Sequence, residues 1–131
     1  LKEASGNISQ ICKMAMHIGD NFNIYSGNDD QTVPILSLGG MGCISTVSNI
    51  IPARYSLMIH DFLDGKFTDA AEQVALKPLI DVIFSEVNPI PIKAALSMMG
   101  KCGLEYRLPL CPPSSKTQFA LYDELRNYGI L

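Results

Sequence analysis

The chain has 131 residues, of which 47% are hydrophobic and 18% are charged, and its formal net charge is −3. This composition argues against disorder and suits one domain with a sizeable core. The ten Lys and Arg residues are scattered rather than clustered, which argues against a surface for nucleic acid or for an anionic membrane. No apolar run approaches the roughly 18 residues that a membrane-spanning helix needs.

The first half of the chain alternates short strands with helices. Strands are expected to end at Ala4, Tyr25 and Ser45, roughly 20 residues apart, and small polar residues follow each end. Asn7 is expected to cap the first helix, with Gln10 three residues later as in a capping box. The expected strands are 1–4, 22–25 and 41–46, and the expected helices run from 8 to 18, up to 38, and from 52 to 65. A repeated βα unit predicts a parallel sheet, either in a doubly wound fold or in part of a (β/α)₈ barrel.

No strand is predicted beyond residue 65. Three helices are predicted instead: 68–84, capped by Thr68 and bent near Pro78; 92–99; and 114–128, capped by Ser114 with Phe119, Tyr122 and Leu125 facing inward. The fold class is therefore α/β, with the last βα units of a barrel in residues 1–65 and a helical C-terminal domain in residues 66–131. Three parallel strands alone would leave two open edges, so a partner segment is expected to complete the sheet.

The sequence begins at Leu1 without an initiator methionine and enters a strand at once. We therefore expect the chain to be one part of a longer protein.

Chemistry in parallel α/β folds lies at the carboxyl ends of the strands. There, Lys2 is the strongest candidate for a catalytic residue. Burial inside a barrel would disfavour its charged form, and a neutral amine attacks a ketone to form an imine. The plain alternative is a surface lysine. Residues 26–29 could bind an anion through backbone N–H groups, or could form only a turn and a helix cap.

Metal and cofactor chemistry is not indicated. The four cysteines, Cys12, Cys43, Cys102 and Cys111, have no C-x-x-C spacing, so we expect reduced, mostly buried thiols. Asp29 and Asp30 could ligate a metal, but no third acidic residue lies nearby. We expect neither a metal nor a cofactor.

Several strings resemble a known family: Lys2-Glu3-Ala4-Ser5-Gly6-Asn7, Ser26-Gly27-Asn28-Asp29, Gly42-Cys43-Ile44-Ser45, Asn88-Pro89-Ile90-Pro91-Ile92-Lys93, Arg107-Leu108-Pro109-Leu110 and Asn127-Tyr128-Gly129-Ile130-Leu131. The first is similar to the imine-forming strand of the pyruvate-dependent class I aldolases related to N-acetylneuraminate lyase. The Asn-Pro-Ile-Pro and Arg-Leu-Pro-Leu strings are similar to those of the dihydrodipicolinate synthases within that superfamily.

The resemblance implies a (β/α)₈ barrel with a helical C-terminal domain, in a chain about twice as long as this one. It implies a lyase of lysine and diaminopimelate biosynthesis that condenses pyruvate with L-aspartate-4-semialdehyde to 4-hydroxy-tetrahydrodipicolinate. Lys2 would form the Schiff base with pyruvate, Ile44 would contact pyruvate through its backbone, and Gly27 would line the pocket.

The resemblance also implies a cytoplasmic homotetramer. The N-terminal half of the same polypeptide would supply a tyrosine, a threonine and an arginine to the site, so this chain alone is expected to be inactive. Asn28 stands where Asp is frequent in the family, and Cys43 where Val is common. Two alternatives remain open: a related aldolase acting on N-acetylneuraminate or a 2-keto-3-deoxy sugar acid, and a non-catalytic half-barrel that serves as an assembly module.

Overall fold

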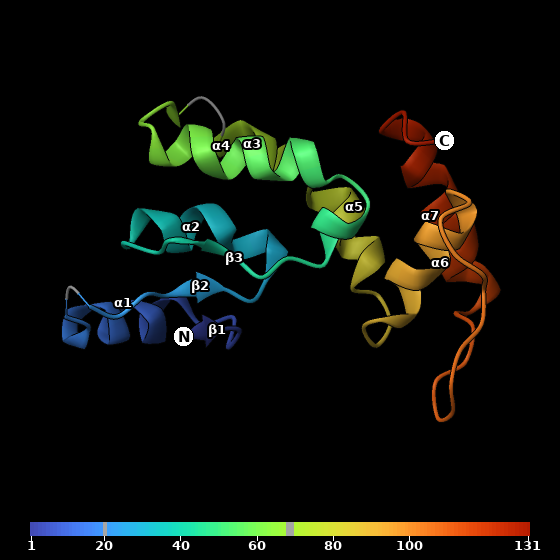
Figure 1. Cartoon of the computed structure of the whole chain (residues 1–131), viewed down its shortest axis with the longest axis horizontal. Helices are drawn as coiled ribbons and strands as arrows, with labels where there is room; N and C mark the ends of the chain where they lie inside the picture. Colours follow the sequence, from blue (N-terminus) through green and yellow to red (C-terminus); the bar gives the residue numbers. More distant parts are fainter. Residues whose placement is uncertain (20, 68–69) are drawn as a thin grey trace. The chain divides into compact units, whose positions relative to one another are not determined.

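The computed structural model describes residues 1–19, 21–67 and 70–131, which form two compact units, Leu1–Ala75 and Leu76–Leu131. The first unit contains the strands β1 (Lys2–Glu3), β2 (Tyr25–Ser26) and β3 (Gly42–Cys43), which form one parallel sheet in the order β1-β2-β3 (Figure 1). Its helices are α1 (Ile8–His17), α2 (Thr32–Ser37), α3 (Pro52–Leu63) and α4 (Ala70–Ala75), with 3₁₀ turns η1 (Asp29–Gln31) and η2 (Val47–Asn49). The predicted alternation of strands and helices is confirmed.

The regular strands are shorter than predicted. Each has two residues, and β2 begins at Tyr25, where the predicted strand ended. Backbone hydrogen bonds nevertheless continue the ladder beyond these bounds. The N–H of Gly27 donates to the carbonyl of Glu3 (2.6 Å), and the N–H of Ile44 donates to the carbonyl of Ser26 (2.8 Å).

The start of α1 follows its predicted cap. The side-chain oxygen of Asn7 accepts the N–H of Gln10 at 3.1 Å. The reciprocal half of a capping box is replaced, because the N–H of Asn7 donates to the hydroxyl of Ser5 (3.2 Å). The helix ends at His17, before the predicted stop at Gly19 and Asp20, of which Asp20 lies outside the described residues.

The core of the first unit lies on one face of the sheet. Ile11 of α1, Ile24 beside β2 and Ile35 of α2 form its centre and are at most 4% exposed. On the opposite face, Tyr25 is 36% exposed and Ile44 is 51% exposed. The sheet of the described chain is therefore covered on one side only.

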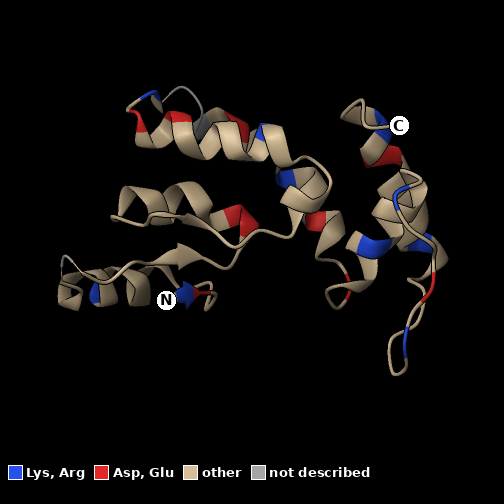
Figure 2. Cartoon of the chain, in the orientation of Figure 1, with Lys and Arg blue, Asp and Glu red and all other residues tan. Residues whose placement is uncertain are grey.

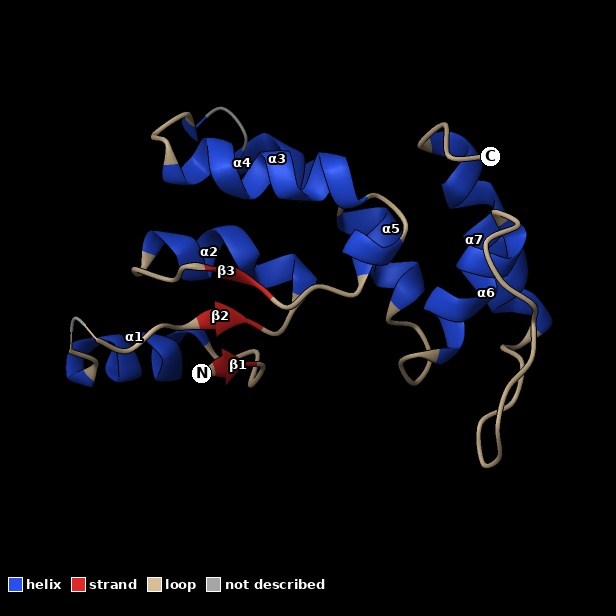
Figure 3. Ribbon diagram, viewed as in Figure 1, coloured by secondary structure: helices blue, strands red, loops and turns tan. Residues whose placement is uncertain are grey.

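The second unit contains only helices among its described elements: α5 (Lys77–Ile83), α6 (Ile90–Met98) and α7 (Ser115–Asn127) (Figure 3). The predicted long helix is interrupted at Leu76, so that Pro78 occupies the first turn of α5, where its missing N–H costs no hydrogen bond. Its predicted cap, Thr68, lies outside the described residues. Proline also accounts for the start of α6, which begins two residues earlier than predicted, because Pro91 is tolerated in its first turn.

The cap of α7 is confirmed, and so is the inward position of Leu125, but the inward positions predicted for Phe119 and Tyr122 are wrong. The hydroxyl of Ser114 accepts the N–H of Thr117 (3.3 Å). Phe119 is 72% exposed and Tyr122 is 46% exposed, whereas Leu121 and Leu125 are fully buried. The helix packs on α5 and α6 through residues spaced by four, so the buried stripe is rotated away from the two aromatic rings.

The compact units divide after Ala75, because α4 packs against α2 and α3. The domain limits given from the sequence, 1–65 and 66–131, stay a prediction. Basic and acidic residues are interspersed along both units (Figure 2). Among the described residues, no helix is long and apolar enough to cross a membrane.

Candidate active site

The three predicted site residues share the uncovered face of the sheet. The register pairs Lys2 with Tyr25, and Tyr25 with Gly42. Because paired residues of parallel strands point to one face and alternate residues repeat it, Gly27 and Ile44 stand on that same face. The structure thus places Lys2, the first residue of β1, on the same face as Gly27 and Ile44, which directly follow β2 and β3.

Gly27 leaves the space that the Lys2 side chain occupies. A Cβ atom at this position would lie 2.9 Å from Cε of Lys2, 2.7 Å from Cβ of Ala4 and 3.0 Å from the carbonyl oxygen of Glu3. Cβ atoms of real residues essentially never lie under 3.0 Å from another heavy atom, as the contacts with Lys2 and Ala4 would require. The absence of a side chain at Gly27 therefore lets the Lys2 chain cross the neighbouring strand end.

The burial expected for Lys2 is not found in this chain. Its side chain is exposed, and within the described residues its ammonium group has no ion-pair partner. The physical reason is that no described segment covers this face, where Ile44 is also exposed.

Asp29, which follows β2, is bonded to the segment that follows β3. It is 1% exposed, and its Oδ2 atom accepts the backbone N–H groups of Thr46 (2.9 Å) and Val47 (3.3 Å). These bonds occupy the carboxylate that the sequence offered as a possible metal ligand. Among the described residues, no group of three or more His, Cys, Asp or Glu side chains could hold a metal ion.

The main chain of Asp29 is held as firmly as its side chain. Its carbonyl accepts the side-chain amide of Gln73 (2.7 Å) and the hydroxyls of Tyr55 (3.1 Å) and Thr32 (3.3 Å). The amide oxygen of Gln73 in turn accepts the N–H of Val33 at 3.1 Å. Sequence reasoning missed Gln73, since nothing local marks a glutamine that bonds to a residue 44 positions away.

Burial sets the protonation of two neighbouring groups. It strongly raises the pKa of the Tyr55 hydroxyl, and the nearby charge of Asp29 raises it further. Burial likewise raises the pKa of the Cys43 thiol. Both groups therefore stay protonated near neutral pH, and Cys43 is not an activated nucleophile.

The turn at residues 26–29 is a structural turn. The N–H of Asn28 donates to the hydroxyl of Ser26 (3.2 Å), and that hydroxyl donates to the carbonyl of Asn28 (2.7 Å). With the N–H of Gly27 also bonded to Glu3, these donors are not available to an anion. All four cysteines are free thiols as predicted, but Cys102 and Cys111 are exposed, so the expectation of mostly buried thiols is wrong.

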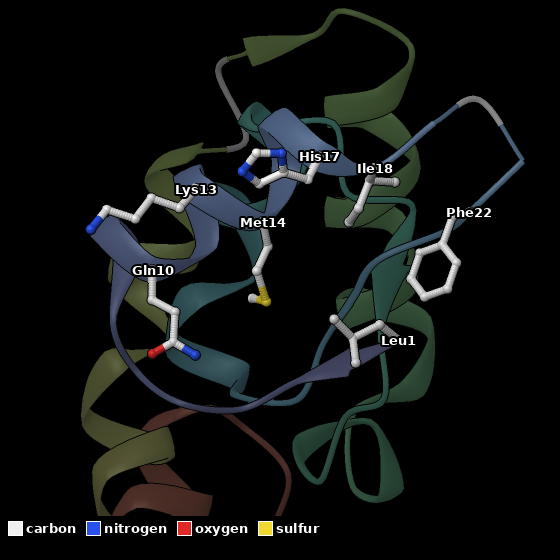
Figure 4. Close-up of a pocket in the computed structure, with 7 residues that line it drawn as sticks. All are labelled: Leu1, Gln10, Lys13, Met14, His17, Ile18 and Phe22. Atoms are coloured by element: carbon white, nitrogen blue, oxygen red, sulfur yellow. The ribbon is translucent and has the colours of Figure 1, made fainter.

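Two depressions flank the two edge strands. The first, of about 310 Å³, lies between α1 and Leu1, which precedes the edge strand β1. Figure 4 shows the side chains that line it: Leu1, Gln10, Lys13, Met14, His17, Ile18 and Phe22. The second, of about 270 Å³, lies at β3 and is lined by Gly42 and Cys43 among others. Neither depression includes Lys2 in its lining.

Comparison with known proteins agrees with the sequence motifs. The profile of the Dihydrodipicolinate synthetase family matches residues 1–127. The chain is 48% identical over 132 residues to 4-hydroxy-tetrahydrodipicolinate synthase 1 of Clostridium acetobutylicum, a match that covers 100% of this chain and 45% of the relative. It is 46% identical to the 4-hydroxy-tetrahydrodipicolinate synthase of Thermoanaerobacter sp., covering 100% of this chain and 44% of the relative.

Solved structures agree with the sequence matches. The crystal structure of dihydrodipicolinate synthase from Thermotoga maritima superposes with a TM-score of 0.95 at 39% identity, covering 99% of this chain and 45% of that one. The crystal structure of dihydrodipicolinate synthase from Aquifex aeolicus gives a TM-score of 0.94 at 36% identity, covering 98% of this chain and 44% of that one. The chain spans less than half the length of the curated relatives it matches. The resemblance predicted from the motifs is confirmed: the chain belongs to the dihydrodipicolinate synthetase family.

Proposed function

We propose that this chain is the C-terminal part of a (β/α)₈ barrel enzyme that condenses pyruvate with L-aspartate-4-semialdehyde to 4-hydroxy-tetrahydrodipicolinate, in lysine and diaminopimelate biosynthesis. Two findings support the proposal: the chain belongs to the family over nearly its whole length, and Lys2 lies in β1 on the uncovered face of the sheet, beside Gly27. The second finding carries the chemistry, because imine formation needs an amine with an open approach.

In the proposed reaction, the neutral amine of Lys2 attacks the keto carbon of pyruvate, and loss of water gives a protonated imine. The imine is an electron sink, so the methyl carbon loses a proton and becomes an enamine. The enamine carbon attacks the aldehyde carbon of the semialdehyde. The amino group of that substrate then attacks the imine carbon, closes the ring and releases Lys2.

The roles of Gly27 and Ile44 follow from hydrogen bonds that are already made. The N–H of Ile44 is donated to Ser26, so its carbonyl oxygen is the backbone atom proposed to contact bound pyruvate or its imine. Gly27 lines the same pocket and keeps it open, since a side chain there would collide with Lys2.

We propose that the N-terminal half of the same polypeptide completes the site. The strands of that half would pair with the open edges of β1 and β3, and its apolar side chains would fill the two flanking depressions. The closed barrel would then cover Lys2. Such cover would remove Lys2 from water and favour its neutral form. It would also supply the tyrosine, threonine and arginine that the resemblance implies. The resemblance further favours a homotetramer in the cytoplasm.

The proposal is tested by turnover of the complete protein. Purified protein is given pyruvate with aspartate semialdehyde and, in parallel, N-acetylneuraminate and a 2-keto-3-deoxy sugar acid. We expect turnover with pyruvate plus aspartate semialdehyde, and none with N-acetylneuraminate or the 2-keto-3-deoxy sugar acid. Preferred cleavage of a sugar acid would assign the chain to a sister aldolase, and no turnover with any substrate would favour the assembly module.

A further inference from the structure

A buried polar cluster lies behind the strand ends and has no role in the chemistry proposed so far. Its centre is Asp29, two residues after Gly27. Among the described residues, no hydrogen bond of Asp29 runs to Lys2, Gly27 or Ile44. Asp29 is nevertheless almost completely buried, as is Gln73, which is 7% exposed. Burying polar side chains is costly unless each of their groups finds a partner, so a cluster of this kind needs an explanation.

The hydrogen bonds of Asp29 join two loops that are separate in sequence. Its carboxylate accepts the N–H groups of Thr46 and Val47, which are 17 and 18 residues away and follow directly after Ile44 and Ser45. The end of β2, which carries Gly27, is thereby tied to the segment that follows β3, which carries Ile44.

Asp29 is itself held from two helices. Tyr55 comes from α3 and Gln73 comes from α4, and both donate to the carbonyl of Asp29. The same amide of Gln73 accepts the N–H of Val33 in the first turn of α2. The residue is therefore fixed at both its main chain and its side chain, as a positioning group must be.

A simple capping role does not account for the cluster. Within the turn η2 the N–H of Ser48 has a local partner, because the hydroxyl of Ser45 accepts it at 2.8 Å. The long-range bonds of Asp29 add a constraint between the segments after β2 and β3 that this local bond cannot supply.

We propose that Asp29 is a positioning residue for the pyruvate-imine site. Held by Tyr55 and Gln73, it fixes the carbonyl of Ile44 relative to Gly27 and Lys2 without touching substrate. This inference rests on the proposed function, since it concerns how the same site is kept in register. Its effect should appear in pyruvate binding and imine formation, because small displacements of reacting groups are costly in rate.

The test compares two substitutions in the complete protein. Asp29→Ala removes the acceptor for both N–H groups, whereas Asp29→Asn can keep an oxygen at the position of Oδ2. We expect Asp29→Ala to raise the KM for pyruvate and to slow borohydride trapping of the pyruvate imine by about tenfold or more. Asp29→Asn should recover both values to within about threefold of the parent.

A matched control separates positioning from stability. Thr117 is also a buried polar residue, but it lies in α7 of the second unit, so Thr117→Val should lower the melting temperature and leave the KM for pyruvate unchanged. If Asp29→Ala does not fold, Gln73→Glu replaces it. That variant keeps the acceptor for Val33 and loses the donor to Asp29, and we expect the same direction of change.

The outcomes distinguish the two levels of inference. If the unsubstituted protein traps no pyruvate, the proposed function fails. If it traps pyruvate normally, while Asp29→Ala, or Gln73→Glu in its place, melts earlier but binds and traps pyruvate like the parent, the proposed function stands and the positioning role is overturned.

Discussion

Both units bury aliphatic side chains, but they differ in how many polar side chains they bury. Of the six buried polar or charged residues among those described, five lie in the first unit and one in the second: Glu3, Ser26, Asp29, Thr32 and Gln73, against Thr117. The interior of the second unit is made of aliphatic side chains, with Leu79, Leu121 and Leu125 fully buried where α5, α6 and α7 pack together.

The difference distinguishes aliphatic burial, which stabilises the fold, from buried hydrogen bonds, which fix the positions of the loops after the strands. Aliphatic burial stabilises the second unit without fixing particular atoms, whereas buried hydrogen bonds are directional and set the position of each loop. The buried polar residue Asp29 follows Gly27 by two positions and bonds to the N–H groups of Thr46 and Val47, which follow Ile44. We therefore expect substitutions in the two units to affect different measurements.

The largest expected effect is on turnover. Lys2→Ala should lower kcat by roughly a thousandfold or more, because it removes the amine that forms the imine. The pocket around Lys2 has to stay open to pyruvate, and Lys2 forms no ion pair with the described residues, so its removal should change the free energy of unfolding by no more than about 1 kcal/mol. Steady-state assays and urea unfolding measure the two effects. Lys116→Ala in α7 is the control, and comparable turnover in Lys2→Ala and Lys116→Ala would contradict the assignment.

The next effect is on stability, in the second unit. Leu121→Ala should lower the free energy of unfolding by about 2–5 kcal/mol, because it leaves a cavity among buried side chains. Phe119→Ala removes a larger side chain that is 72% exposed, and should cost less than about 1 kcal/mol. Urea titration of both variants decides whether α7 packs as described. A larger loss for Phe119→Ala would show that the outer face of α7 is the covered one.

A third substitution joins stability to chemistry. Gly27→Ala places a Cβ atom against Lys2, Ala4 and the carbonyl of Glu3, so it should destabilise the protein by about 1–3 kcal/mol and slow imine formation. Gly19→Ala is the control, since a Cβ there meets nothing within 4 Å. Chemical denaturation and the rate of pyruvate trapping give the two readouts. Normal trapping by Gly27→Ala would contradict the close approach of Lys2.

The smallest effect is a pH dependence of the second unit. Hydrogen bonds from the hydroxyl of Thr117, and from the hydroxyl and N–H of Ser114, lower the pKa of the exposed Glu86 carboxyl. A lowered pKa in the folded state stabilises the protein above the ordinary glutamate range, and this stabilisation is lost as the pH falls through the lowered value. Thermal melts across that acidic range should show a shallower loss for Glu86→Gln than for the parent. Identical slopes would remove Glu86 from the cap of α7.

Local signals in the sequence predicted the local structure. Asn7 and Ser114 were identifiable as caps because the signal is local: each side chain accepts the N–H of the residue three positions later. The parallel order of the strands followed from the repeated βα unit, and the strand ends pointed to Lys2 and to residues 26–29. The choice of Gly27 and Ile44 as site residues came from the family resemblance.

Long-range packing could not be predicted in this way. The helix α7 has apolar residues on two faces, and only its contacts with α5 and α6 decide that Leu121 is buried and Phe119 is not. The bond between Gln73 and Asp29 depends on how α4 packs, which no local pattern specifies.

The most direct test of the central claim is reductive trapping. The complete protein is incubated with pyruvate and sodium borohydride, digested, and analysed by peptide mass spectrometry. The account predicts one stable adduct, formed by reduction of the pyruvate imine and located on Lys2. No adduct, or an adduct on another lysine, would contradict it.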